Sequence, residues 1–203
     1  MQADMSHTQG GSFSRAHVEA VLRESAEVKL RAAAAIAEDI ARGGDLLAAA
    51  YARGAKALVF GNGGSAADAQ HFVAELVGRY RANRPAVAAL ALSANPSTVT
   101  CIANDFGYDE LFARQIEAYA AAGDVALAIS TSGRSACVLR GLEKARERGC
   151  VTLGLSGGDG GPMRALCDLC VLAPSSVTAR IQELHITVLH LWCDAIEARL
   201  FGM

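Results

Sequence analysis

An imidazole and a carboxylate lie one helical turn apart in the first half of this 203-residue chain. His71 and Glu75 are four positions apart, and residues i and i+4 of a helix share one face. Both side chains can therefore reach the same point. This arrangement suits either a metal ion held by a ring nitrogen and a carboxylate oxygen, or an acid–base pair that moves a proton.

A second group of polar side chains interrupts the last apolar segment of the chain, at about residues 178–201. A single histidine in such a segment is typical of a core residue whose ring is hydrogen-bonded, but several polar groups together indicate a site. The group consists of Gln182, Glu183, His185 and His190.

The spacing of Gln182 and His190 limits what one helix could do with both. Eight residues span about 12 Å along a straight helix, and the two side chains point about 80° apart. Metal–ligand bonds, by contrast, are about 2 Å long. Three alternatives follow: Gln182 lies in a bend before the regular helix, the two residues serve different copies of the site, or only one is a ligand.

Two segments rich in Gly and Ser follow apolar runs and precede helical stretches. Residues 61–65 are Gly-Asn-Gly-Gly-Ser, residues 130–135 are Ser-Thr-Ser-Gly-Arg-Ser, and a third Gly-rich turn covers 156–161. Glycine lets the backbone approach a ligand closely, and a helix N-terminus offers free N–H groups and a partial positive charge. We therefore expect an anion site, most naturally for phosphate, built from hydroxyls and backbone amides.

The first of these segments also fits a relaxed dinucleotide-binding pattern, Gly61-x-Gly63-x-x-Ala66. That pattern requires an acidic residue about 20 positions further on, at the end of the second strand, to bind a ribose. The corresponding residues 90–93 are Leu-Ala-Leu-Ser, which include no carboxylate. The sequence therefore does not support a dinucleotide site.

Five short apolar runs, separated by helical stretches, must position these groups. The runs do not alternate cleanly with polar residues, which is typical of strands buried on both faces of a parallel sheet. Alternation of strands and helices predicts a doubly wound α/β sandwich, in which ligands gather at the carboxyl ends of the strands. We expect strands at 57–60, 86–92, 125–129, 151–155 and 169–172, and helices at 65–82, 108–121, 134–149, 162–166 and 178–201.

The chain before the first strand is expected to hold a flexible tail, residues 1–14, and two helices. The first helix covers residues 15–42 and ends at Gly43-Gly44. Asp45 then caps a second helix, which runs to about Arg53. Residues 15–203 form a single domain that includes both helices.

Composition excludes several classes of function. Hydrophobic residues make up 52% of the chain and the net charge is -2, so we expect a large core and no nucleic-acid partner. No apolar run is long enough to span a membrane and no signal peptide is recognised, so a cytoplasmic protein is expected.

Cysteine usage agrees with a reducing compartment. Most of the six cysteines lie in apolar runs, as buried thiols do. Cys167-x-x-Cys170 has no second Cys or His pair at zinc-finger spacing. We interpret it as the start of a buried strand rather than a metal or redox motif.

Taken together, these segments resemble the sugar isomerase (SIS) domain family over about residues 15–201. The two loops alone are generic for SIS domains, whereas the residues on the helices are similar to the branch that isomerises heptose phosphates. The resemblance is carried by the segments 61–65, 71–76, 78–81, 104–107, 129–133 and 180–186.

The resemblance implies a three-layer α/β sandwich with a five-stranded parallel sheet of flavodoxin-like type, in a homotetramer with sites at subunit interfaces. It implies that the substrate phosphate contacts Ser130, Thr131, Ser132 and Ser135. It implies zinc, in the members that carry it, bound by His71, Glu75, Gln182 and His190. The other substrate contacts that it implies are Asn62, Gly63, Gly64, Ser65, Glu75, Arg79, Asn104, Asp105 and Gln182.

The activity that the resemblance implies is an aldose–ketose isomerase, which converts sedoheptulose 7-phosphate to D-glycero-D-manno-heptose 7-phosphate through an enediolate. We expect Glu75 to move the carbon-bound proton and His190 to act as the complementary acid or base, or the reverse. A zinc ion would polarise the carbonyl and enediolate oxygens.

Two alternatives to this activity are a non-catalytic SIS tetramer that binds a replication-initiation protein, and an SIS isomerase for another sugar phosphate. The non-catalytic relatives have Thr in place of the second loop glycine and lack the carboxylate. Gly64 and Glu75 therefore favour the enzyme.

Overall fold

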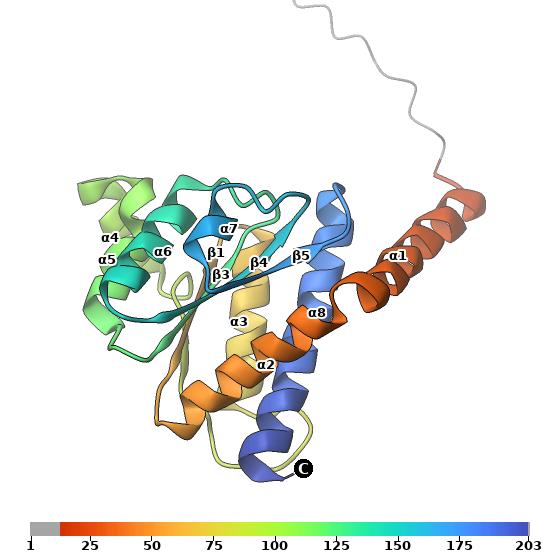
Figure 1. The fold of residues 1–203 in the computed structure, drawn as a ribbon. Helices are drawn as coiled ribbons and strands as arrows, with labels where there is room; N and C mark the ends of the chain where they lie inside the picture. The colour runs from red at the N-terminus through yellow and green to blue at the C-terminus, as the bar shows by residue number, and fades with distance from the viewer. Residues whose placement is uncertain (1–12, 203) are drawn as a thin grey trace, which may run out of the picture.

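The computed structural model describes residues 13–202 and has the expected α/β architecture (Figure 1). Five parallel strands form one sheet in the order β2-β1-β3-β4-β5. Every residue of β1 and β3 is buried, which explains why their sequences are unbroken apolar runs. The strands are β1 (Ala57–Gly61), β2 (Ala89–Ala91), β3 (Val125–Ile129), β4 (Val151–Gly157) and β5 (Leu169–Ala173).

Two helical layers complete the predicted three-layer sandwich. One face of the sheet is covered by α1 (Arg15–Ala35), α2 (Ala37–Ala52), α3 (Gly64–Val77) and α8 (Thr178–Phe201). The other is covered by α4 (Pro96–Phe106), the 3-10 helix η1 (Tyr108–Glu110), α5 (Leu111–Tyr119), α6 (Ala136–Glu147) and α7 (Met163–Leu166). Successive side chains of a strand point to opposite faces, so Val59 joins the first core while Leu58 and Phe60 join the second.

The predicted end of the first helix at Gly43-Gly44 is wrong. The helix breaks at Ile36 instead, and both glycines lie buried inside α2. A Cβ on Gly43 would lie 2.6 Å from the indole ring of Trp192 on α8, and one on Gly44 would lie 2.7 Å from the Cβ of Ala195. The glycines therefore allow α2 to approach α8 closely rather than ending a helix.

Other helix and strand boundaries also differ from the predicted ones. The second strand is limited to Ala89–Ala91, because the register pairs Ala89 with Ala57, the first residue of β1. The helix expected over 65–82 ends at Val77, and the segment 108–121 divides into η1 and α5. Asp45 does not cap a helix, since it lies inside α2.

The expected elements include no helix over residues 96–106, where α4 lies. Asn95 caps this helix by accepting a hydrogen bond from the N–H of Thr98, and Pro96 occupies its first position. Both are ordinary signals of a helix start. The sequence therefore contained the information needed to predict α4.

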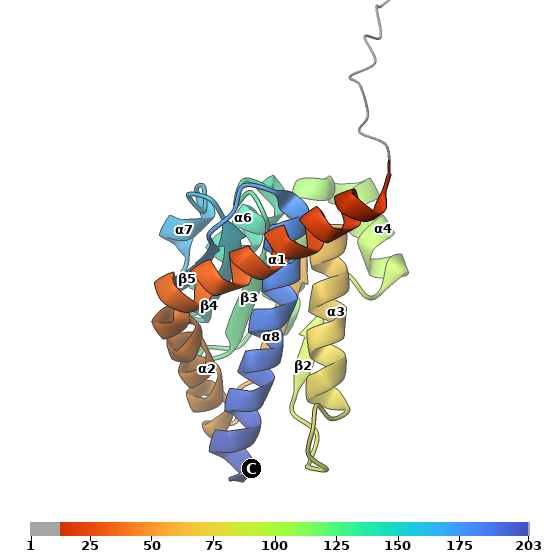
Figure 2. The same ribbon diagram turned by 90° about the vertical axis from the view of Figure 1, so that its right-hand side faces the viewer.

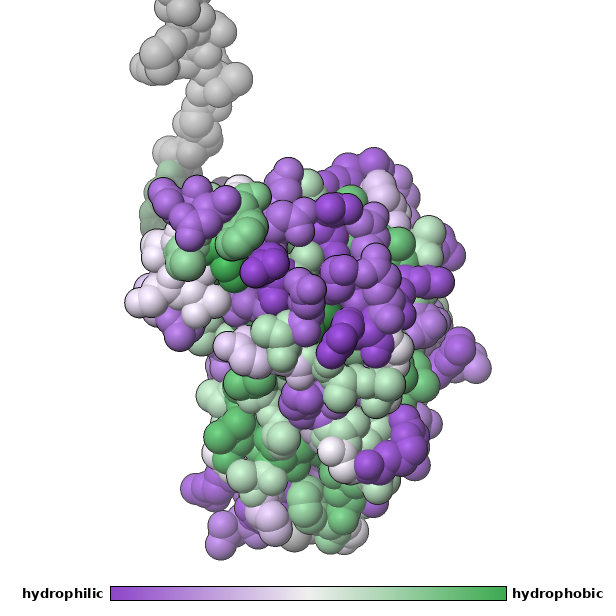
Figure 3. Space-filling model, turned by 90° about the vertical axis from the view of Figure 1, so that its left-hand side faces the viewer, coloured by the Kyte–Doolittle hydropathy of each residue, from purple (hydrophilic) through white to green (hydrophobic). Residues whose placement is uncertain are grey.

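The tail predicted for residues 1–14 lies outside the described residues except for its last two positions. Ser14 caps α1 by accepting a hydrogen bond from the N–H of His17. Among the described helices, none has the length and hydropathy needed to cross a bilayer. Figure 3 shows the face on the side of α4 and α5, where hydrophilic side chains gather above, towards the carboxyl ends of the strands, and apolar ones are more frequent below.

Candidate active site

Helices α3 and α8 carry the predicted chemical groups and lie side by side (Figure 2). Each begins at the end of the sheet where the strands finish, because α3 follows β1 and α8 follows β5. β1 and β3 are neighbours in the sheet, but β1 leads to α3 on one face and β3 leads to α6 on the other. A crevice forms where neighbouring strands connect to opposite faces, and ligands bind there in such folds.

A cavity of about 170 Å³ lies at this crevice, between the loops 61–65 and 130–135 and the start of α8. Gly64 leaves room for the Gln182 side chain, since a Cβ on Gly64 would lie 2.5 Å from its amide nitrogen. Hydroxyls and amides dominate the lining, as expected for a phosphate site without a buried cation. The lining residues are Asn62, Ser65, Ile129, Ser130, Thr131, Ser132, Ser135 and Gln182.

The loop 130–135 is held in place by a chain of buried hydrogen bonds. The Ser156 hydroxyl donates to the carbonyl oxygen of Ser130 at 2.8 Å, and His185 Nε2 donates to the carbonyl oxygen of Ser156 at 3.1 Å. Burial lowers the pKa of His185 to about 4, although the hydrogen bond to Ser156 raises it. His185 is therefore a neutral core histidine that supports the loop.

Three possible metal-ligand atoms converge between α3 and α8. His71 Nε2 lies 3.0 Å from His190 Nε2 and 3.3 Å from Glu75 Oε1, and all three groups lie within 4.8 Å of one another. In a tetrahedral zinc site with bonds near 2.0–2.1 Å, neighbouring ligand atoms are about 3.3 Å apart. The spacing of these atoms therefore fits a metal ion, with one coordination position left for another group.

Two residues that the sequence reasoning missed hold this cluster in position. The ring of Tyr80 stacks on His190, with centroids 5.5 Å apart and planes at 20°. The fully buried side chain of Arg84 donates to the main-chain oxygens of Glu75 and Leu76, both at 2.7 Å. Arg84 thereby satisfies carbonyl groups that the end of α3 leaves free and fixes the backbone of Glu75. Neither residue belongs to a periodic pattern that could have indicated its role.

The structure narrows the alternatives for Gln182 and His190. The alternative that Gln182 lies before the regular helix is wrong, because α8 begins at Thr178. Gln182 lines the cavity between the two loops, whereas His190 belongs to the cluster with His71 and Glu75. Two alternatives remain: Gln182 serves another copy of the site, or it is not a metal ligand.

Six of the predicted substrate contacts do not line the cavity. Gly63 and Gly64 lie at the start of α3, and Glu75 belongs to the cluster with His71 and His190. Asn104 and Asp105 are exposed on α4, where the Asn104 amide donates to the Asp105 carboxylate at 2.7 Å, and Arg79 is exposed beyond the end of α3. Their role in binding substrate stays a prediction. The sequence reasoning missed Tyr108, whose hydroxyl donates to Asn62 Oδ1 at 3.0 Å and links η1 to the first loop.

Comparisons with known proteins place this chain in a family. The SIS domain model matches residues 22–157. The chain is similar to the phosphoheptose isomerase of Geobacter sp. (strain M21), with 50% identity over 184 residues, covering 91% of this chain and 96% of the relative. Its structure is similar to that of phosphoheptose isomerase from Neisseria gonorrhoeae, with a TM-score of 0.86 and 40% identity, covering 91% and 98% of the two chains. The structure of a phosphoheptose isomerase from Francisella tularensis gives a TM-score of 0.86 at 32% identity, covering 89% and 96%.

Proposed function

The chain belongs to the SIS-domain family and, within it, to the phosphoheptose isomerases, and from this premise we propose how its site interconverts sedoheptulose 7-phosphate and D-glycero-D-manno-heptose 7-phosphate. One observation carries the proposal: Glu75 and His190 meet on neighbouring helices that both begin at the anion cavity. The site thus combines an anchor for phosphate with a pair of groups that can transfer protons.

In the proposed complex, the terminal phosphate lies in the cavity against the hydroxyls of Ser130, Thr131, Ser132 and Ser135. The axis of α3 rises about 9 Å from Ser65 to His71, at 1.5 Å per residue. A rise of this size suits an extended seven-carbon chain that reaches from the cavity towards the histidines. Phosphate binding would then orient C1 and C2 and supply binding energy far from the reacting atoms.

Isomerisation requires one proton to move between carbons and others to move on the two oxygens. Starting from the aldose, Glu75 removes the proton from C2 and later delivers it to C1, while His190 protonates O1 and accepts the proton from O2. The reverse assignment of the two residues uses the same groups. Stacking on Tyr80 supports this role, because it fixes the plane of the His190 ring.

We propose zinc as the metal of the cluster, bound by His71, Glu75 and His190. Two imidazole nitrogens and a carboxylate oxygen are a donor set that zinc accepts. Gln182 from another copy of the chain is the proposed fourth protein ligand. When bound, zinc would polarise the carbonyl oxygen of the sugar.

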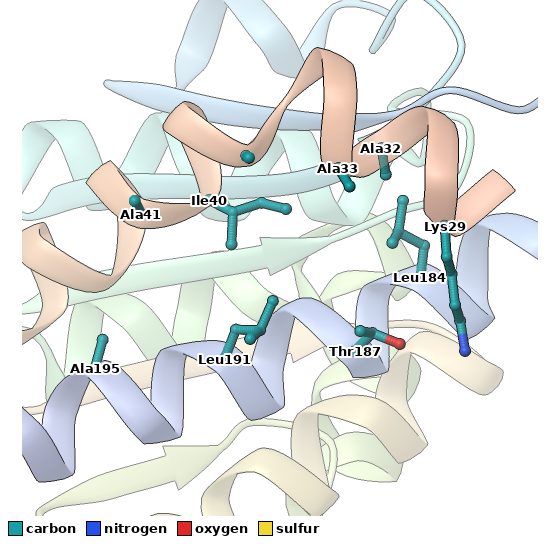
Figure 4. Close-up of a pocket in the computed structure, with 10 residues that line it drawn as sticks. Lys29, Ala32, Ala33, Ile40, Ala41, Leu184, Thr187, Leu191 and Ala195 are labelled. Atoms are coloured by element: carbon teal, nitrogen blue, oxygen red, sulfur yellow. The ribbon is translucent and has the colours of Figure 1, made fainter. Parts of the chain in front are cut away.

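We also propose that the protein is a homotetramer. An apolar groove of about 450 Å³ lies between α8 and the pair α1 and α2, where Ile40 and Leu191 face each other and alanines of all three helices form part of the walls (Figure 4). Leu22 and Leu30 on α1 are 64% and 71% exposed, and Leu191 is 45% exposed. Exposed apolar surface of this kind marks protein interfaces. Native mass spectrometry would contradict the proposal if it found a monomer.

We propose a cytoplasmic location as well. The six cysteines are all unpaired thiols in the structure, as is usual where the surroundings are reducing. Fractionation of the source cells followed by immunodetection would test this, and recovery from an oxidising compartment would contradict it.

The proposed reaction is tested by mixing the purified protein with sedoheptulose 7-phosphate and following the aldose product by NMR. We expect conversion that a chelator removes and added zinc restores. Parallel assays with pentose and hexose phosphates serve as controls for the substrate. Equal turnover of a shorter sugar phosphate, or no conversion by folded protein, would contradict the proposal.

A further inference from the structure

Two thiols lie at the junction of α7 and β5, away from the cluster of histidines. Cys167 directly follows α7, and Cys170 is the second residue of β5, where it pairs with Gly154 of β4. A Cβ on Gly154 would lie 2.8 Å from the sulfur of Cys167 and 3.0 Å from that of Cys170. Both sulfurs therefore flank the same point, and they can be no further apart than the sum of these two distances.

We propose that Cys167 and Cys170 form a redox-active dithiol, which closes to a disulfide on reaction with a low-molecular-weight disulfide such as oxidised glutathione. Both residues are only partly buried, and neither is in a disulfide. The sequence predicted a strand start at this motif, and Cys170 does lie in β5. The convergence of the two sulfurs beside Gly154 adds a role that spacing alone did not indicate.

The surroundings favour Cys170 as the attacking sulfur. Interaction with Cys167 lowers the pKa of the Cys170 thiol, burial opposes this, and the positive charge of Arg164 assists it. The same interaction raises the pKa of Cys167. Thiolate is the reactive form, so Cys170 reacts first and Cys167 resolves the intermediate.

The reaction is balanced in two exchange steps. The Cys170 thiolate attacks one sulfur of oxidised glutathione, and that S–S bond breaks to release one glutathione thiolate, which takes up a proton. Cys167 then loses its proton to solvent and attacks the Cys170 sulfur, which expels the second glutathione. The two electrons leave the protein thiols and reduce the glutathione disulfide, so no other co-reactant is needed.

A short path connects this dithiol to the anion cavity. The methyl group of Met163, the first residue of α7, lies 3.1 Å from the same point beside Gly154. The N–H of Met163 donates to the carbonyl oxygen of Gly133, in the loop that lines the cavity, at 3.2 Å. Since α7 has only four residues, a shift of Cys167 on disulfide closure moves the anchor of that loop. We therefore expect oxidation to weaken phosphate binding, a step that rests on the proposed function.

Alkylation and peptide mass mapping test the dithiol itself. Full-length protein is equilibrated with oxidised glutathione, quenched in acid, alkylated with N-ethylmaleimide and digested. We expect a Cys167–Cys170 disulfide in the wild type and in Cys101→Ser, a control that removes an exposed thiol on α4. Cys167→Ser should accumulate glutathione on Cys170, because the resolving thiol is gone. The proposal is overturned if both cysteines of the wild type stay open to alkylation.

Steady-state kinetics test the link to the cavity. Oxidation should raise KM for sedoheptulose 7-phosphate by about fivefold, the low end of typical coupling between sites, with a smaller change in kcat. Dithiothreitol should reverse the change, and Cys170→Ser should not respond to oxidised glutathione. An unchanged KM in protein shown to carry the disulfide would refute the link. If the reduced protein showed no turnover, the proposed function would fail, while the mass map would still decide the dithiol.

Discussion

Replacing Arg84 with methionine should destabilise the protein strongly. Arg84 Nε donates to the carboxylate of Glu197 at 3.1 Å, and both side chains are almost fully buried, at 0% and 5% exposure. Methionine keeps much of the side-chain volume but leaves a buried charge without its partner. Breaking a buried ion pair from one side costs about 3–5 kcal/mol. We expect a loss of that size in the free energy of unfolding.

Urea unfolding at one fixed protein concentration measures this loss, since assembly would make stability depend on concentration. Arg81→Met is the matched control. Arg81 pairs with Asp194 at 2.9 Å, but its side chain is 70% exposed, so its loss should cost about 1 kcal/mol or less. A result for Arg84→Met within about 1 kcal/mol of that control would refute the reasoning.

The pH dependence offers a second measure of the same pair. Burial raises the pKa of Glu197, but hydrogen bonds from the N–H groups of Ala82 and Arg81 and from Arg84 outweigh it, so the pKa lies below its ordinary value. A carboxylate with a lowered pKa in the folded protein stabilises it above the unfolded pKa of about 4.3. That stability is lost as the pH falls through the lower, folded value. Glu197→Gln should therefore flatten the acid limb of the stability profile.

Three further predictions concern single positions. Glu75→Gln should keep the fold and phosphate binding but lower turnover by about 100- to 10,000-fold, as measured by NMR and by calorimetry with inorganic phosphate; wild-type turnover would exclude Glu75 as the base. Gly64→Ala should raise KM more than it lowers kcat, because the new methyl group displaces the Gln182 amide, 2.5 Å away; an unchanged KM would show that Gln182 does not shape the cavity. Gly43→Ala should lower the Tm. Crowding of the new methyl group against Trp192 costs about 1–3 kcal/mol of folding free energy, which outweighs the gain in helix propensity of about 1 kcal/mol. A higher Tm would contradict this.

The sheet and the two loops could be predicted because their signals are local. Unbroken apolar runs indicate strands covered on both faces, and Gly and Ser directly after two of them indicate a ligand site at the strand ends. The spacing of His71 and Glu75 likewise predicts that both side chains lie on one face of a helix. The structure confirms this, because their possible ligand atoms lie close together.

The remaining features depend on contacts between distant residues. A pair of glycines gives the same local signal whether it ends a helix or admits a neighbouring one, and only Trp192 on α8 decides the case for Gly43. Arg84 can be buried because its positive charge is paired with Glu197, 113 residues further along the chain. The two partners of each contact lie far apart in the sequence, so no local pattern could have predicted either contact.

The composition of the proposed phosphate cavity has a thermodynamic consequence for a reversible enzyme. Ketose and aldose carry the same phosphate at the same end, so a phosphate bound by the hydroxyls around Ser130, as proposed, would hold both with equal strength. Such binding would affect how long either sugar remains bound, but it could not favour one direction over the other. Any preference between the two must arise at the far end of the pocket, where the molecules differ.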